Sequence, residues 1–251
     1  MLSKFFYHYA SPQHFYPLAG RLWPWFALGA AGLGLWGLWL GFFVAPTDFQ
    51  QGEGYRIIFV HVPVSWMSMI IYLAMAFWAL LGLTLNTRLS GMMCRALAPT
   101  GAICAFLSLW TGALWGKPMW GTWWVWDARL TSTLVLLFLF IGVIALRSAM
   151  ENRQAAGRAT AILAVVGVIN LPIIKFSVNW WNTLHQPASF TLTEKPAMPA
   201  EMWMPLLVMV IGFYLFMLVA LILGMRNEVL RRESRTQWVK QWAQEKSRHA
   251  V

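Results

Sequence analysis

The sequence predicts an all-α integral membrane protein with six transmembrane helices, on the basis of three observations. Of its 251 residues, 59% are apolar and 11% are charged, whereas soluble domains carry about 25% charged residues. The mean hydropathy is +0.57. The apolar residues also gather in six runs, each close to the roughly 20 residues that a bilayer-spanning helix needs. This pattern argues against a single soluble core.

The six runs follow one another with short connections. They cover residues 24–44, 62–85, 97–114, 130–146, 159–178 and 204–224. The first run is longer than the about 7–15 apolar residues of a signal peptide, and no small-x-small cleavage pattern precedes Pro46, so we expect a retained helix. Glycine and proline inside the runs are compatible with spanning helices, because neighbouring helices satisfy the freed backbone groups.

The distribution of Lys and Arg predicts the orientation of these helices. Fourteen of the nineteen basic residues fall on the side that holds both termini, which places the N- and C-termini in the cytoplasm. The net charge of +10 reflects this bias and an attraction of the tail to anionic lipid, so it requires no nucleic acid partner. We therefore expect one six-helix domain over residues 1–225 and a basic cytoplasmic tail over 226–251.

One of the three predicted outer loops is rich in tryptophan. The loops cover 45–61, 115–129 and 179–203, and the stretch WGKPMWGTWWVWDARLT occupies 115–131. As an interfacial helix, this stretch would place Trp120, Trp123, Trp124 and Asp127 on one face. Three indoles on one stripe would make a flat apolar surface as wide as a large aromatic ligand. The alternative is plain membrane anchoring, for which tryptophan is common at both interfaces.

Two histidines, His61 and His185, fall on the same predicted outer side and come from different loops. A single histidine at a membrane edge is usually structural. Two that flank an indole surface suit the two axial positions of a haem iron. Zinc is disfavoured, because it needs three or four ligands and no companion Cys, Asp or Glu lies at the usual spacing.

The outer cations suit the two propionates that a porphyrin carries. Arg56, Lys117 and Arg129 are available there, and arginine pairs with carboxylates in a bidentate way. For Asp127 we favour a structural role, a local ion pair with Arg129 that fixes the loop, because an acid beside a propionate would repel it.

Three outer motifs together resemble one known family. Residues 120–131, WGTWWVWDARLT, resemble the "WWD" signature of haem-handling proteins, and YRIIFVHVP at 55–63 and NLPII at 170–174, leading to WWNTLHQ at 180–186, also match. With only six helices, the chain is similar to the CcmC family of bacterial cytochrome c maturation, whereas the CcmF and CcsA types carry more helices. The resemblance covers roughly residues 20–225.

The resemblance implies a set of residues, a cofactor and partners. Members of this family hold haem b on the periplasmic face of the bacterial inner membrane, which would make His61 and His185 the axial ligands. The surrounding platform would consist of Trp115, Trp120, Trp123, Trp124, Trp126 and Asp127. The implied partners are the haem chaperone CcmE, the small membrane protein CcmD and the ABC transporter CcmA/CcmB.

Other functions remain open from the residues alone. A permease for haem or a small solute, as a subunit of an ABC transporter complex, would need a polar path through the bundle, which Asn170 and Pro172 would help to line. A hydrolase is disfavoured, because His-Glu-x-x-His and Gly-x-Ser-x-Gly are both absent. A pure assembly scaffold would bind no haem. The sequence has no Walker A motif, and it does not decide whether the chain catalyses haem attachment to the chaperone.

Overall fold

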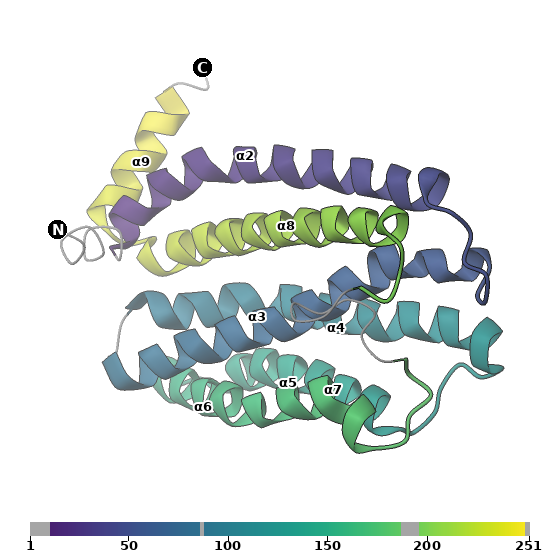
Figure 1. The fold of residues 1–251 in the computed structure, drawn as a ribbon. Helices are drawn as coiled ribbons and strands as arrows, with labels where there is room; N and C mark the ends of the chain where they lie inside the picture. Colours follow the sequence, from purple (N-terminus) through teal and green to yellow (C-terminus); the bar gives the residue numbers. More distant parts are fainter. Residues whose placement is uncertain (1–10, 86–87, 187–195, 249–251) are drawn as a thin grey trace.

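The computed structural model describes residues 11–85, 88–186 and 196–248, and its regular structure there is helical (Figure 1). The α-helices are α2 (Pro12–Trp39), α3 (Ile58–Leu85), α4 (Arg88–Trp120), α5 (Ala128–Ala149), α6 (Arg153–Val166), α7 (Asn170–Trp180), α8 (Ala200–Glu233) and α9 (Gln237–Arg248). Three short turns complete the set: a π-helical turn η1 (Leu40–Val44) and the 3-10 turns η2 (Glu53–Ile57) and η3 (Gly167–Ile169).

Six of the resulting segments are long and apolar enough to cross a membrane, which confirms the predicted number of spans. Each of the six spans extends beyond its predicted run at one end or at both. α4, for example, covers Arg88–Trp120, whereas the apolar run covers 97–114. The reason is that apolarity marks the part of a helix that meets hydrocarbon, whereas the backbone hydrogen bonds continue into the interface.

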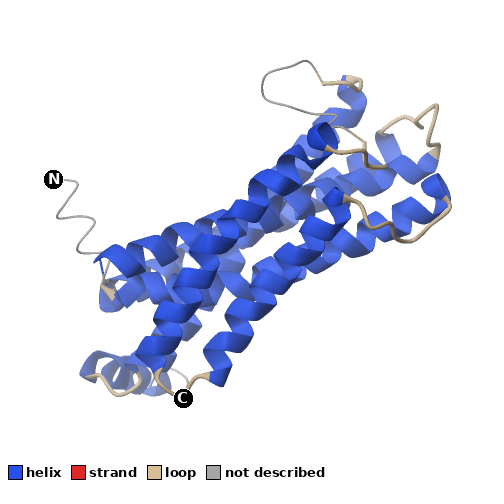
Figure 2. Cartoon of the chain, turned by 90° about the horizontal axis from the view of Figure 1, so that it is seen from below, coloured by secondary structure: helices blue, strands red, loops and turns tan. Residues whose placement is uncertain are grey.

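The helices lie in three layers (Figure 1). α2 packs along α8, α3 packs along α4, and α5, α6 and α7 form the third layer, with α4 in contact with both α8 and α5. Successive spans run in opposite directions, so the loops gather at the two ends of the bundle, as Figure 2 shows. The connections 45–52, 121–127 and 181–186 share the end that holds the tryptophan-rich stretch.

The fifth span has two parts, α6 and α7, joined by η3. Gly167 allows the close approach of α3 there, because a Cβ at this position would collide with the hydroxyl of Tyr72. The amide of buried Asn170 donates to the carbonyl of Ser132 on α5 at 2.9 Å. Pro172 falls in the first turn of α7, where its missing N–H costs no helical hydrogen bond.

The described part of the C-terminal segment, residues 226–248, is largely helical. α8 continues past Arg226 to Glu233, and α9 then turns back onto the start of α2. The ring centroid of Tyr16 lies 6.0 Å from that of Trp238 and 5.1 Å from that of Trp242. The apolar side of α9 is therefore packed against the bundle.

The centre of the bundle is closely packed around two aromatic side chains. Tyr72 and Phe140, both fully buried, meet edge to face with ring centroids 5.1 Å apart. Gly101 on α4 makes room for this pair, because an added Cβ would overlap the ring of Phe140.

We expect Gly101→Ala to lower the free energy of unfolding by about 1–3 kcal/mol, because a methyl group would be forced into a filled core. Gly32→Ala is the matched control, since nothing lies within 4 Å of its added Cβ. Thermal unfolding in detergent would measure both variants, and an equal loss of stability would contradict this account of the packing.

Candidate functional site

A cavity of about 720 Å³, including its open mouth, lies at the end of the bundle that holds the tryptophan-rich stretch. Its walls come from α3, α4, segment 121–127, α5, α7 and segment 181–186. Histidine, tryptophan, serine, threonine and arginine side chains line it together with apolar residues.

Both predicted histidines line this cavity, and their rings lie close together. The ring centroids of His61 and His185 lie 6.3 Å apart, with 36° between the ring planes. His61 belongs to the first turn of α3, whereas His185 belongs to the segment after α7. The structure thus brings together two imidazoles from distant parts of the chain.

A threonine on α4 fixes the tautomer of His61. The Nδ1 atom of His61 lies 2.8 Å from Oγ1 of Thr111. The Thr111 hydroxyl donates its one hydrogen to the carbonyl of Leu107 at 2.6 Å, so it accepts at the histidine. His61 therefore carries its hydrogen on Nδ1, which leaves the lone pair on Nε2.

His185 has the same tautomer for a different reason. Its Nδ1 atom lies 2.8 Å from the carbonyl oxygen of Gln186, which can only accept. Burial, and secondly the positive charge of Arg129, lower the pKa of His185 from its ordinary value. At neutral pH the ring is uncharged, and its Nε2 offers a lone pair to a ligand or a metal.

The indoles around the cavity do not form the flat stripe that the sequence suggested. α4 ends at Trp120, Gly121 adopts a φ of 75°, and residues 122–127 are not helical, so the expected interfacial helix is wrong. A residue at this φ ends a helix, and glycine adopts it without steric cost. The side chain of Lys117 also donates to the carbonyl of Gly121 at 3.0 Å.

Four of the five predicted platform tryptophans line the cavity: Trp115, Trp120, Trp123 and Trp124. They include one edge-to-face pair, Trp115 and Trp120, with centroids 4.7 Å apart. Trp124 forms the other pair with Trp126, which is 77% exposed and outside the cavity lining. The buried indole N–H of Trp124 has no acceptor among the described residues, which makes it available to a bound ligand.

Asp127 connects the tryptophan-rich segment to the segment of His185. Its Oδ1 accepts from the backbone N–H of Leu130 at 2.8 Å and caps the start of α5. Its Oδ2 accepts from the hydroxyl of Thr183, and the Thr183 oxygen accepts from the backbone N–H of His185 at 3.1 Å. The carboxylate thus positions His185 and does not itself line the cavity.

The expected ion pair between Asp127 and Arg129 is not among those that the described residues form. Arg129 donates instead to the carbonyl of Ile174 on α7 at 2.8 Å. The expectation fails because the capping position of Asp127 directs its carboxylate to backbone N–H groups and to Thr183. Arg129 is the one charged side chain among the described residues of the lining, so the cavity favours an anionic group.

The structure places Arg56 outside the cavity lining. Its guanidinium donates to the carbonyls of Gly41 at 2.6 Å and Ala45 at 2.9 Å, and it pairs with Glu53. These carbonyls belong to the end of η1, where the backbone leaves its helical hydrogen bonds. Arg56 therefore stabilises the exit from the first span.

Comparison with known proteins places the chain in a family. The chain matches the family described as CcmC, heme exporter protein C, over residues 5–240. It is 48% identical over 236 residues to heme exporter protein C of Escherichia coli K12, which covers 94% of this chain and 95% of that protein. It is 45% identical over 245 residues to the protein of the same name from Haemophilus influenzae, with 96% and 98% covered.

The chain belongs to the CcmC family.

Several positioning residues of this CcmC-family chain were not found by sequence reasoning. The role of Thr183 could have been predicted, because a threonine hydroxyl commonly accepts from the backbone N–H two residues later in a loop. The role of Thr111 could not have been predicted, because it depends on how α3 and α4 align. The same holds for Gln51, which accepts from the indole N–H of Trp115 at 3.1 Å and donates to the side chain of Gln186 at 3.3 Å.

We expect Thr183→Val to speed hydrogen exchange at the His185 amide while leaving the Leu130 amide unchanged. Asp127→Ala removes the acceptor of the Leu130 amide and of the Thr183 hydroxyl that positions His185. Exchange should therefore rise at the Leu130 and His185 amides, with a stability loss of about 0.5–2 kcal/mol from the lost cap. Hydrogen exchange followed by mass spectrometry would separate the two effects. Unchanged protection of His185 in both variants would rule out the connection through Asp127.

Proposed function

We propose that this chain binds haem b between His61 and His185 and delivers it to the haem chaperone CcmE for c-type cytochrome maturation. The observation that carries the proposal is the separation of the two imidazoles, together with the hydrogen bonds that commit each Nδ1. Membership of a family named for heme export supports the same cargo.

The spacing of the rings fits one metal ion between them. A metal–imidazole bond of about 2 Å puts each ring centroid about 3 Å from the metal, so imidazoles on opposite sides of one ion have centroids about 6 Å apart. The observed separation of 6.3 Å is close to this value. Two neutral imidazoles are also a common axial pair for haem iron.

The walls of the cavity suit the rest of the cargo. Trp115, Trp120, Trp123 and Trp124 offer apolar and aromatic surface to a macrocycle. Arg129 lines the cavity, so its guanidinium is available to one propionate carboxylate. The cavity opens to the outside of the bundle, so a bound ring would remain within reach of another protein.

Transfer requires partners that this chain does not supply. The Lys and Arg bias favours a periplasmic position for the cavity, in the inner membrane of a bacterium. Release of tightly held haem needs energy, and the absence of a Walker A motif supports an ATP-driven partner, the ABC transporter CcmA/CcmB, with CcmD as a further membrane partner.

A permease is the less favoured function. Beneath the cavity, the described part of the bundle is filled by fully buried side chains, among them Ile71, Tyr72, Met75 and Phe140. Asn170, which the permease reading placed on a polar path, is buried and donates to the carbonyl of Ser132. The packing therefore supports a site that is open at one end.

We expect His61→Ala and His185→Ala each to reduce the haem content of the purified protein by more than about tenfold. Loss of a group that only supports a metal ligand already weakens metal binding by about tenfold or more, and loss of the ligand itself should cost more. His14→Ala, at the opposite end of the bundle, is the control and should keep wild-type haem. Absorption spectra would test this, and wild-type bands in both cavity variants would exclude axial ligation.

We also expect Arg129→Gln to weaken haem binding roughly tenfold or more, because a hydrogen bond to a charged group contributes about 1.5–3 kcal/mol. Arg56→Gln should keep wild-type affinity and lose stability, since two carbonyls lose their donor. Haem dimethyl ester, which lacks both carboxylates, should bind wild type and Arg129→Gln equally. A loss of ester binding in Arg129→Gln would mean that Arg129 acts by shaping the cavity.

A further inference from the structure

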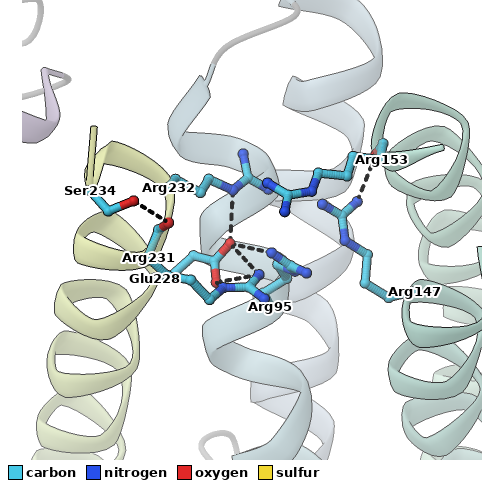
Figure 3. Close-up of polar contacts among 7 residues, drawn as sticks. All are labelled: Arg95, Arg147, Arg153, Glu228, Arg231, Arg232 and Ser234. Carbon is cyan, nitrogen blue, oxygen red and sulfur yellow. Dashed lines mark hydrogen bonds and ion pairs between the residues drawn. The ribbon is translucent and has the colours of Figure 1, made fainter. Parts of the chain in front are cut away.

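A cluster of arginines surrounds one buried carboxylate at the end of the bundle opposite the histidines (Figure 3). Glu228 on α8, with 9% of its side chain exposed, accepts from Arg95 on α4 and from Arg231 and Arg232 on α8. Arg147 of α5 reaches toward the cluster and donates to the carbonyl of Arg153 at 3.2 Å. The side chain of Arg153 also lies at this cluster, so five guanidiniums surround one carboxylate and the net charge is +4.

Most of the donors in this cluster are not used by the protein. The guanidiniums of Arg95, Arg231 and Arg232 carry fifteen N–H groups, at five each. Four of these donate to Glu228. No other acceptor for these groups is seen in the described ranges. The arrangement therefore has spare capacity for an anion with several oxygen atoms.

A cavity of about 570 Å³, including its open mouth, adjoins the cluster between α4 and α8. One part of its lining is polar and the other is apolar. The polar part consists of Arg95, Thr100, Asn227, Glu228 and Arg231, and the apolar part of Ala96, Pro99, Ala220 and Gly224. This division suits a ligand with a charged head and an apolar body.

The apolar part continues toward the middle of the membrane. On α4, Ile103 follows Ala96 and Pro99 on the same helix face and is 60% exposed. On α8, Phe216 precedes Ala220 on the same face and is 53% exposed. An acyl chain would find apolar side chains along this path.

The depth of the cluster matches the head group region of a bilayer. Arg95 precedes Trp115 by twenty residues on one helix. This separation corresponds to about 30 Å along the axis, the thickness of the hydrocarbon core. With Trp115 at one interface, Arg95 lies at the other.

We propose that the cavity between α4 and α8 binds the phosphate of an anionic phospholipid, with Arg95 and Arg231 as its donors. Basic pockets between transmembrane helices are a known way for proteins to hold acidic lipid head groups. The negative charge of Glu228 is neutralised by the arginines that donate to it. The cavity lining therefore keeps a net positive charge. This site is independent of the proposed haem function.

Native mass spectrometry of the delipidated full chain in detergent tests the proposal. Phosphatidylglycerol should bind roughly tenfold more tightly than phosphatidylcholine with the same acyl chains. The double variant Arg95→Gln, Arg231→Gln should bind both lipids equally. The matched control Arg21→Gln, Arg158→Gln removes the same charge from exposed positions at the same end and should keep the preference.

A second variant tests the proposal independently, in case the double variant misfolds. Ala220→Phe fills the apolar part of the cavity, changes no charge, and should weaken phosphatidylglycerol binding while circular dichroism still shows the helices. Inorganic phosphate in excess should not displace the lipid; displacement would make this a site for a soluble anion. Equal binding of the two lipids by wild type, or an equal loss in the control, would overturn the proposal and favour an acidic segment of a protein partner instead.

Discussion

The architecture depends on one constraint, the need to satisfy every backbone N–H and carbonyl group without water. In hydrocarbon, a helix meets this requirement, because its backbone groups bond to one another within a single segment. The described non-helical connections accordingly lie at the ends of the bundle. Irregular backbone, and the side chains that it positions, can exist there because water and polar head groups are near. The cavity with the two histidines occupies one of these ends, and the arginine cluster the other.

At the cavity end, a few polar contacts hold together segments that are far apart in the sequence. Thr111 connects α4 to the ring of His61, and Asp127 connects the start of α5 to the segment of His185 through Thr183. Each of these side chains also bonds to the backbone of its own helix: the Thr111 hydroxyl donates to the carbonyl of Leu107 on α4, and the other carboxylate oxygen of Asp127 caps α5. The same groups therefore stabilise the helices and set the distance between the imidazoles.

Much of the fold was predictable, because the length and apolarity of a run are local properties. The alternation of six spans also placed His61 and His185 on one side of the membrane, and the structure brings their rings together. The helix ends were less accessible, since apolarity does not mark where hydrogen bonding stops. The helical stripe of tryptophans failed at Gly121, whose positive φ ends α4 before the spacing can continue.

The details of the site depend on tertiary contacts that local pattern does not encode. Both Asp127 and Arg129 were recognised as important, yet each takes its partner from a different segment, Thr183 and Ile174 respectively. Arg56 appeared equivalent to Arg129 by charge and by side of the membrane. It differs because the carbonyls that end η1 lie within its reach.

The separation of the two histidines along the chain has a consequence for biosynthesis. His185 is made roughly 120 residues after His61, and chains grow from the N-terminus at about 5–20 residues per second. A nascent chain that has inserted its first four spans holds one imidazole and most of the indoles, but no opposing ring. The pocket is completed only when the fifth span and the segment after it have entered the membrane. Half-made chains therefore lack the paired site, and ribosomal synthesis itself sets the moment at which it first forms.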